Sequence, residues 1–117
     1  MPAGKYDILI EQGATFQEVY TLRDVNKALI NLTGYTGAMQ IRETVDSTSA
    51  LASSTGTDPT ITVTLGGAAG TITVSMTSEA TAALSFDKAV YDLEITLGSV
   101  VTRLLEGVVT LSREVTR

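Results

Sequence analysis

The sequence contains no cysteine, no histidine and no tryptophan, and only two of its 117 residues are proline. The absence of cysteine excludes disulfides, thiolate metal sites and thiol catalysis. The absence of histidine removes the commonest metal ligand and the side chain that most often acts as a general acid or base near neutral pH. Aromatic residues make up only 5% of the chain, which leaves little for stacking on sugar rings and disfavours a secreted carbohydrate-binding module.

The chain has a moderate share of charged residues, and the acidic ones outnumber the basic ones. Charged residues are 18% of the chain, the net charge is −5, and the eight basic residues are scattered rather than clustered. A negative field repels phosphates, so nucleic-acid binding is disfavoured. The 44% hydrophobic content predicts one folded domain over residues 1–117, with a short flexible N-terminal arm at about residues 1–5. The only apolar stretch near the start, residues 8–10, is broken by Glu11, which predicts neither a signal peptide nor a membrane span.

What the chain does contain is a period-two alternation of apolar and polar residues, clearest in residues 88–117. This pattern is typical of strands with one buried face, and it predicts two long strands joined at Gly98-Ser99. Residues of one parity are apolar, namely Ala89, Tyr91, Leu93, Ile95 and Leu97, continued after the turn by Val101, Leu105, Val109, Leu111 and Val115. Most of these are therefore expected inside, and Asp92, Glu94 and Glu106 outside.

Earlier segments predict further strands at residues 6–11, 15–22, 36–43, 61–65 and 71–76, with a short edge strand at 28–30. Glycine-rich residues 66–70 predict a hairpin turn, and the small polar residues 44–59 the longest exposed connection. Thr77 or Ser78 can cap one or two helical turns over residues 77–84, in which Ala80, Ala83 and Leu84 face inward. The pattern favours an all-β, immunoglobulin-like antiparallel β-sandwich with one short helix. A small barrel is the competing closure.

No segment combines the parts of an active site. Residues 66–70 lack the Lys-Ser/Thr pair and the following helix that a phosphate-binding loop needs. Asp87, Asp92 and Glu94 could gather for calcium, but a flat strand face supplies too few oxygens. A carboxylate pair such as Asp92 with Glu106 would need burial to raise one pKa, and both lie on the polar parity. We therefore expect no catalytic residue, no cofactor and no metal site, and a protein that is not an enzyme.

The candidate contact surface consists of apolar residues on the outward parity. Leu104 and Val108 lie among polar residues of the last strand, and Val90 lies on the strand before it. Such residues on neighbouring strands form a patch suited to protein contact. The N-terminal arm, ending near Lys5 and Tyr6, is the second candidate because an extended segment can add to a neighbour.

Several stretches together carry a resemblance to a known group of proteins. They are residues 6–8 (YDI), 11–16 (EQGATF), 31–36 (NLTGYT), 39–43 (MQIRE), 91–93 (YDL) and 101–107 (VTRLLEG). In this arrangement the chain resembles small virion proteins of tailed bacteriophages. It also looks like the immunoglobulin-like N-terminal domain of phage baseplate upper proteins, in which a turn of the LTGY type introduces a core strand.

The resemblance implies a non-enzymatic structural protein of the virion, assembled in the host cytoplasm. Baseplate proteins of this type carry a coiled coil or receptor-binding extension beyond the domain, which these 117 residues do not include. The expected role is therefore an adaptor in the tail or baseplate that bridges larger virion components, in a symmetric multi-copy assembly. The alternative is a capsid cement or decoration protein on the outer shell, and copy number per particle distinguishes the two.

Overall fold

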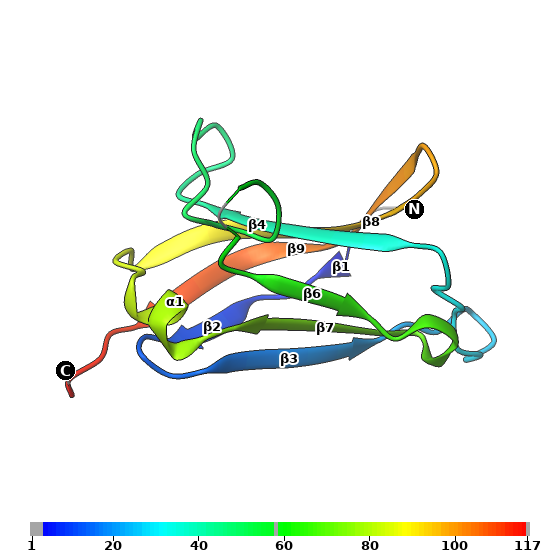
Figure 1. The fold of residues 1–117 in the computed structure, drawn as a ribbon, viewed down its shortest axis with the longest axis horizontal. Helices are drawn as coiled ribbons and strands as arrows, with labels where there is room; N and C mark the ends of the chain where they lie inside the picture. The colour runs from blue at the N-terminus through cyan, green and yellow to red at the C-terminus, as the bar shows by residue number, and fades with distance from the viewer. Residues whose placement is uncertain (1–3, 58, 117) are drawn as a thin grey trace.

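Two β-sheets lie face to face in the computed structural model, which describes residues 4–57 and 59–116 (Figure 1). The larger sheet contains β1 (Gly4–Lys5), β2 (Ile8–Glu11), β4 (Thr36–Arg42), β5 (Ala52–Ser53), β8 (Lys88–Leu97) and β9 (Val100–Ser112). The smaller sheet contains β3 (Phe16–Thr21), β6 (Thr62–Leu65) and β7 (Thr71–Met76). The predicted all-β sandwich is confirmed.

The order of the strands is that of an immunoglobulin-like sandwich. The smaller sheet runs β3-β7-β6, and the larger runs β9-β8-β4-β5, with β1 and β2 following one another along the outer edge of β9. The chain changes sheets after β2, β3, β5 and β7, as in Greek-key sandwiches. The expectation of a wholly antiparallel arrangement needs one correction, because β1 and β2 both pair with β9 in parallel. Parallel pairing follows from topology, since the first and last strands enter this edge from the same end.

The last two strands form the predicted hairpin, with one irregularity that reverses part of β9. Leu93 pairs with Leu105 but Glu94 pairs with Arg103, so Leu104 is an extra residue, a β-bulge. A bulge moves every residue beyond it to the opposite face. Val101, predicted inside, is 57% exposed, and Leu104, predicted outside, packs against the core. Both predictions are wrong for this reason.

Three segments differ from the local patterns. The connection over residues 44–59 contains β5, whose Ala52 is buried against the core. Residues 28–30 form no strand; only an isolated bridge links Arg23 with Leu29. Gly4 and Lys5 pair with β9 instead of forming a free arm, while residues 1–3 of the predicted arm lie outside the described residues.

The predicted helix is α1 (Ser78–Ala82), which carries the chain from the smaller to the larger sheet (Figure 1). The Thr77 hydroxyl accepts from the Ala80 N–H at 3.1 Å and caps it, as expected. Leu84 is buried and Ala80 half-buried, but Ala83 is exposed. Thr81 is fully buried, which the local pattern did not predict. Its hydroxyl accepts from Gly13 N–H at 3.0 Å and donates to the Ala14 carbonyl at 2.8 Å. These bonds tie α1 to the turn between β2 and β3.

The hydrophobic core lies between the sheets and draws on every long strand. Six of the ten apolar-parity residues of the last two predicted strands are buried, namely Ala89, Tyr91, Leu93, Ile95, Val109 and Leu111. Leu105 is partly buried against them, whereas Leu97, Val101 and Val115 are exposed. The smaller sheet contributes Ile72 and Val74, both completely inaccessible to solvent. The core therefore fixes β8 and β9 rigidly and leaves their other face outward, over a broad open surface.

Candidate interaction surface

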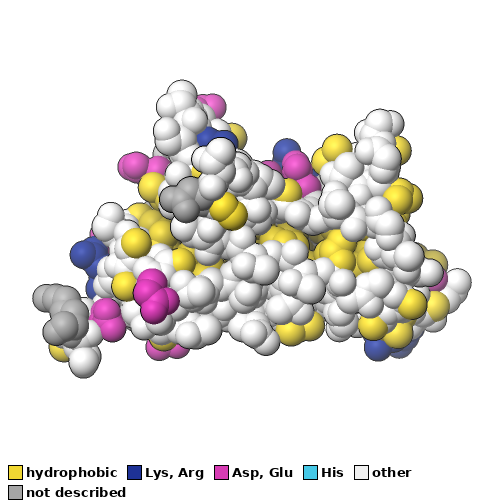
Figure 2. All heavy atoms as spheres, in the orientation of Figure 1, with side chains coloured by type: hydrophobic (Ala, Val, Ile, Leu, Met, Phe, Trp, Pro, Cys, Tyr) yellow, Lys and Arg dark blue, Asp and Glu magenta, His cyan; other side chains and the backbone are white. Residues whose placement is uncertain are grey.

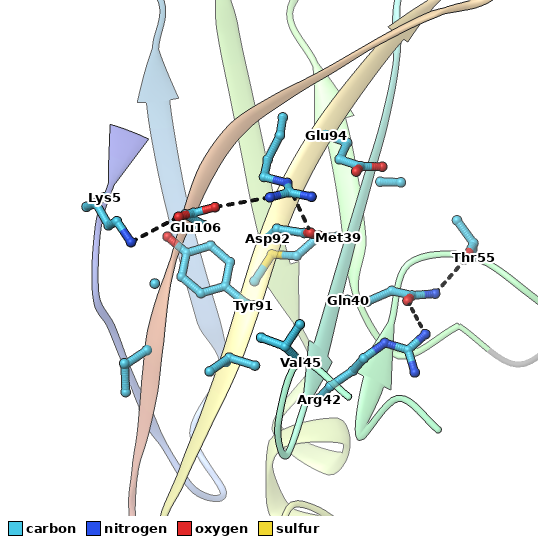
Figure 3. A pocket seen from close by; sticks show the side chains of 15 residues that line it. Lys5, Met39, Gln40, Arg42, Val45, Thr55, Tyr91, Asp92, Glu94 and Glu106 are labelled. Atoms are coloured by element: carbon cyan, nitrogen blue, oxygen red, sulfur yellow. Dashed lines mark hydrogen bonds and ion pairs between the residues drawn. The ribbon is translucent and has the colours of Figure 1, made fainter. Parts of the chain in front are cut away.

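A hollow of about 620 Å³ lies on the outer face of the larger sheet (Figure 3). Its lining includes Lys5, Gln40, Arg42, Val45, Thr55, Val90, Asp92, Glu94, Arg103, Glu106 and Val108. The strand register builds it, since Gln40 pairs with Asp92, Asp92 with Glu106, and Glu106 with Lys5. Side chains from four strands thus form one row across the sheet. The molecule rises on either side of the hollow, in the 43–51 loop and in the β8–β9 hairpin (Figures 1 and 2).

Ion pairs connect one half of this row. Glu106 accepts from Lys5 Nζ at 3.0 Å and from Arg103 Nη1 at 3.3 Å, and Arg103 Nε lies 3.5 Å from Asp92 Oδ2. The Lys5 ammonium first, and then the Arg103 guanidinium, lower the pKa of Glu106 below its usual value. All of these groups are partly exposed to water, so the network orients side chains more than it stabilises the fold.

Arg42 is held only by neutral groups. Its guanidinium donates to the Ser47 carbonyl at 3.0 Å and to Gln40 Oε1 at 2.8 Å, and Gln40 in turn donates to Ser53 Oγ at 3.2 Å. Among the described residues no carboxylate forms an ion pair with Arg42, and none of the described cations forms one with Glu94. The hollow therefore presents one fixed cation and one carboxylate that are available to a partner.

The predicted contact residues separate in the structure. Val90 and Val108 are paired across β8 and β9 and both line the hollow. Lys5 lies on its rim and is bound to Glu106. Leu104 is turned into the core by the bulge. Tyr6 lies outside the lining: its hydroxyl donates to Glu18 Oε2 at 3.1 Å, and its ring meets Tyr20 edge-on with centroids 5.6 Å apart.

A tyrosine contact anchors the N-terminal edge beside the hollow. The Tyr91 hydroxyl donates to the Tyr6 carbonyl oxygen, above Gly107, the residue that pairs with Tyr91 on β9. A Cβ at Gly107 would collide with that carbonyl, so only glycine leaves room for the Tyr6 backbone at this position. Burial raises the pKa of Tyr91 and of Tyr20 above 10.0. The Tyr20 hydroxyl is buried and has no hydrogen-bond partner among the described residues.

An apolar hairpin tip is the surface that the sequence interpretation missed. Leu97, Val100 and Val101 are 44%, 66% and 57% exposed around the Gly98-Ser99 turn. In Figure 2, hydrophobic side chains gather on this raised end of the molecule. The sequence signal was the pair Val100-Val101 immediately after a turn, which places one valine outward whichever face the strand buries.

The acidic side chains considered for a metal site do not gather in the part of the chain that the structure describes. No three His, Asp or Glu side chains of these residues gather into a group that could hold a metal ion. Asp87 pairs with Arg113 at 3.5 Å, at the start of β8 and outside the hollow that holds Asp92 and Glu94. Residues 66–70 form the predicted turn between β6 and β7, through a 3₁₀ turn at Gly67–Ala69.

The described helices are also too short to cross a bilayer. A scan against models of known protein families finds no match for this chain, and a search of curated proteins finds no relative.

Proposed function

We propose that this protein is a non-enzymatic structural component of a tailed-bacteriophage virion, an adaptor in the tail or baseplate that bridges larger components. The observation that carries the proposal is the hollow on the outer face of the larger sheet. It combines the exposed Val45 and Val108, an Arg42 held by hydrogen bonds, and a Glu94 that forms no ion pair with a described residue. Such a surface suits binding to another protein, where apolar contact supplies affinity and charge supplies orientation.

The stretch 31–36, one of those that carry the phage resemblance, forms a turn. Asn31 Oδ1 accepts from Thr33 N–H at 2.9 Å, and Tyr35 N–H donates to the Leu32 carbonyl at 3.0 Å. Leu32 is buried, and Gly34 takes a left-handed backbone with φ of 87°. This turn starts β4, the strand that carries Gln40 and Arg42 into the hollow. A stretch that carries the resemblance therefore leads directly into a strand that lines the hollow.

Counting copies in purified particles tests the proposal. Quantitative mass spectrometry against isotopically labelled peptides of this chain should give a small multiple of three or six copies, as the symmetry of a tail requires. A copy number that matches the capsid shell would instead identify a decoration protein. Absence from the particle would overturn the virion role altogether.

A substitution inside the hollow tests the surface itself. Val108→Asp should leave the isolated domain folded but prevent its incorporation into particles, because a charge would be buried in an apolar contact without a partner. Val25→Asp is the matched control, since Val25 is 98% exposed in a loop outside the hollow. Incorporation of Val108→Asp at wild-type copy number would place the contact elsewhere.

A further inference from the structure

Two exposed apolar surfaces of this molecule have opposite shapes. The tip of the β8–β9 hairpin, residues 97–101, projects from one end and exposes Leu97, Val100 and Val101 (Figure 1). The hollow is concave and exposes Val45 and Val108, with Val45 82% exposed, beside the half-buried Val90. A projecting apolar hairpin and a hollow that offers both valines and charged side chains make a pair of surfaces that two copies of the chain can fit together.

Electrostatics favour contact between copies at these two places. The chain carries a net charge of −5, so two copies repel one another over most approaches. The hollow is an exception, because three basic and three acidic side chains line it, namely Lys5, Arg42, Arg103, Asp92, Glu94 and Glu106. The hairpin tip, Leu-Gly-Ser-Val-Val, carries no charge. A tip entering a hollow is therefore an approach without like-charge repulsion.

The polar groups of the two surfaces also match. Two of the Arg42 N–H groups are used by neutral partners, which leaves other donors of its guanidinium open. Carbonyl oxygens of a hairpin turn are acceptors for such donors.

On the side of β9 away from β8, no strand of the described residues pairs with residues 100–103. Proteins usually protect such an open edge with charge, proline or a covering partner, and of these residues only Arg103 is charged.

We propose that the hairpin tip of one copy docks in the hollow of a second copy, so that the protein assembles with itself through these two surfaces. The inference rests on the proposed function in one respect: it names another copy of this chain as the occupant of the same hollow. A reciprocal exchange of tips closes as a dimer, whereas a head-to-tail contact continues to a ring.

The test uses the isolated chain and three kinds of variant. Light scattering after size exclusion, with native mass spectrometry, should show that the wild type associates as concentration rises from micromolar to millimolar. Val100→Asp at the tip and Val108→Asp in the hollow should each stay monomeric. Val45→Asp provides a second hollow variant on a loop, where a change does not disturb a strand. Val25→Asp, outside both surfaces, should associate like the wild type.

Mixing a tip variant with a hollow variant shows whether these two surfaces bind one another. A tip variant retains an intact hollow and a hollow variant retains an intact tip, so Val100→Asp mixed with Val108→Asp or Val45→Asp should form a one-to-one complex. A wild type that stays monomeric throughout, or tip and hollow variants that associate like it, would overturn the inference. If Val100→Asp is monomeric in isolation but enters particles normally, the contact between copies exists in solution but does not contribute to particle assembly. Self-association without any presence in particles would refute the virion role and leave the contact standing.

Discussion

Leu93 and Glu94 show how strictly alternation on β8 separates core from surface. Leu93 is 1% exposed and pairs with Leu105, while its neighbour Glu94 points into the open hollow. A side chain packed on all sides loses its contacts when it is truncated and leaves a cavity. A truncated side chain on the outer face leaves only water behind.

We expect Leu93→Ala to lower the free energy of unfolding by about 2–5 kcal/mol, measured by urea denaturation. Glu94→Ala is the matched neighbour and should change it by less than about 0.5 kcal/mol, because Glu94 forms no ion pair with a described residue. The reverse result would mean that β8 is shifted by one residue, with every side chain on the opposite face.

Connections between elements depend on a few buried polar groups. Thr81 joins α1 to the turn between β2 and β3 through its bonds to Gly13 and Ala14, and Gln12 donates to the Leu84 carbonyl at 2.7 Å in the same region. These bonds hold the β2–β3 turn against the crossing from β7 to β8. Because Thr81 is completely buried, water cannot replace the hydrogen bonds that its hydroxyl forms with Gly13 and Ala14.

Thr81→Val keeps the shape of the side chain but leaves the Gly13 N–H and the Ala14 carbonyl without this partner. We expect the free energy of unfolding to fall by about 1–3 kcal/mol. Thr64→Val, on the exposed face of β6, should be neutral within about 0.5 kcal/mol. Equal effects of the two substitutions in thermal and urea unfolding would show that the Thr81 bonds do not hold the elements together.

The stability of the whole molecule should depend on pH on the alkaline side. Burial raises the pKa of Tyr20 and Tyr91 above 10.0, and the hydrogen bond to Glu18 does so for Tyr6. The folded state therefore keeps these protons after the unfolded chain releases them. Their contribution is fully present below the unfolded pKa and is lost as the pH rises above it.

We expect the free energy of unfolding to decline as the pH is raised from about 9 to about 12, because the unfolded tyrosines lose their protons near about pH 10. Tyr20→Phe should be almost neutral at pH near 8, because the Tyr20 hydroxyl has no hydrogen-bond partner among the described residues, and it should make the decline less steep. Urea unfolding across this range measures both effects. A wild-type stability that stays constant through the range would contradict the assignment.

Much of the fold follows from short-range patterns. Period-two alternation identifies β8 and β9 because a strand turns successive side chains to opposite faces, and glycine and Asx residues identify the turns that need left-handed or capped backbone. The Thr77 cap identifies α1 in the same local way. Each of these signals depends on neighbours within a few residues, so the sequence by itself determined the all-β class and the longer elements. The short strands β1 and β5, and the choice of a sandwich over a barrel, required the tertiary structure.

The surface was decided by contacts between distant segments. The bulge at Leu104 turned Val101 outward and Leu104 inward. The sequence marks this place only by two successive leucines, Leu104 and Leu105, which do not reveal which of them faces the core. Glu106 became the meeting point of Lys5 and Arg103 only because β1 pairs in parallel with β9. Register, bulges and strand neighbours depend on pairing energies between residues far apart in the chain, which no local period records. The hollow and the exposed hairpin tip are therefore products of the tertiary structure.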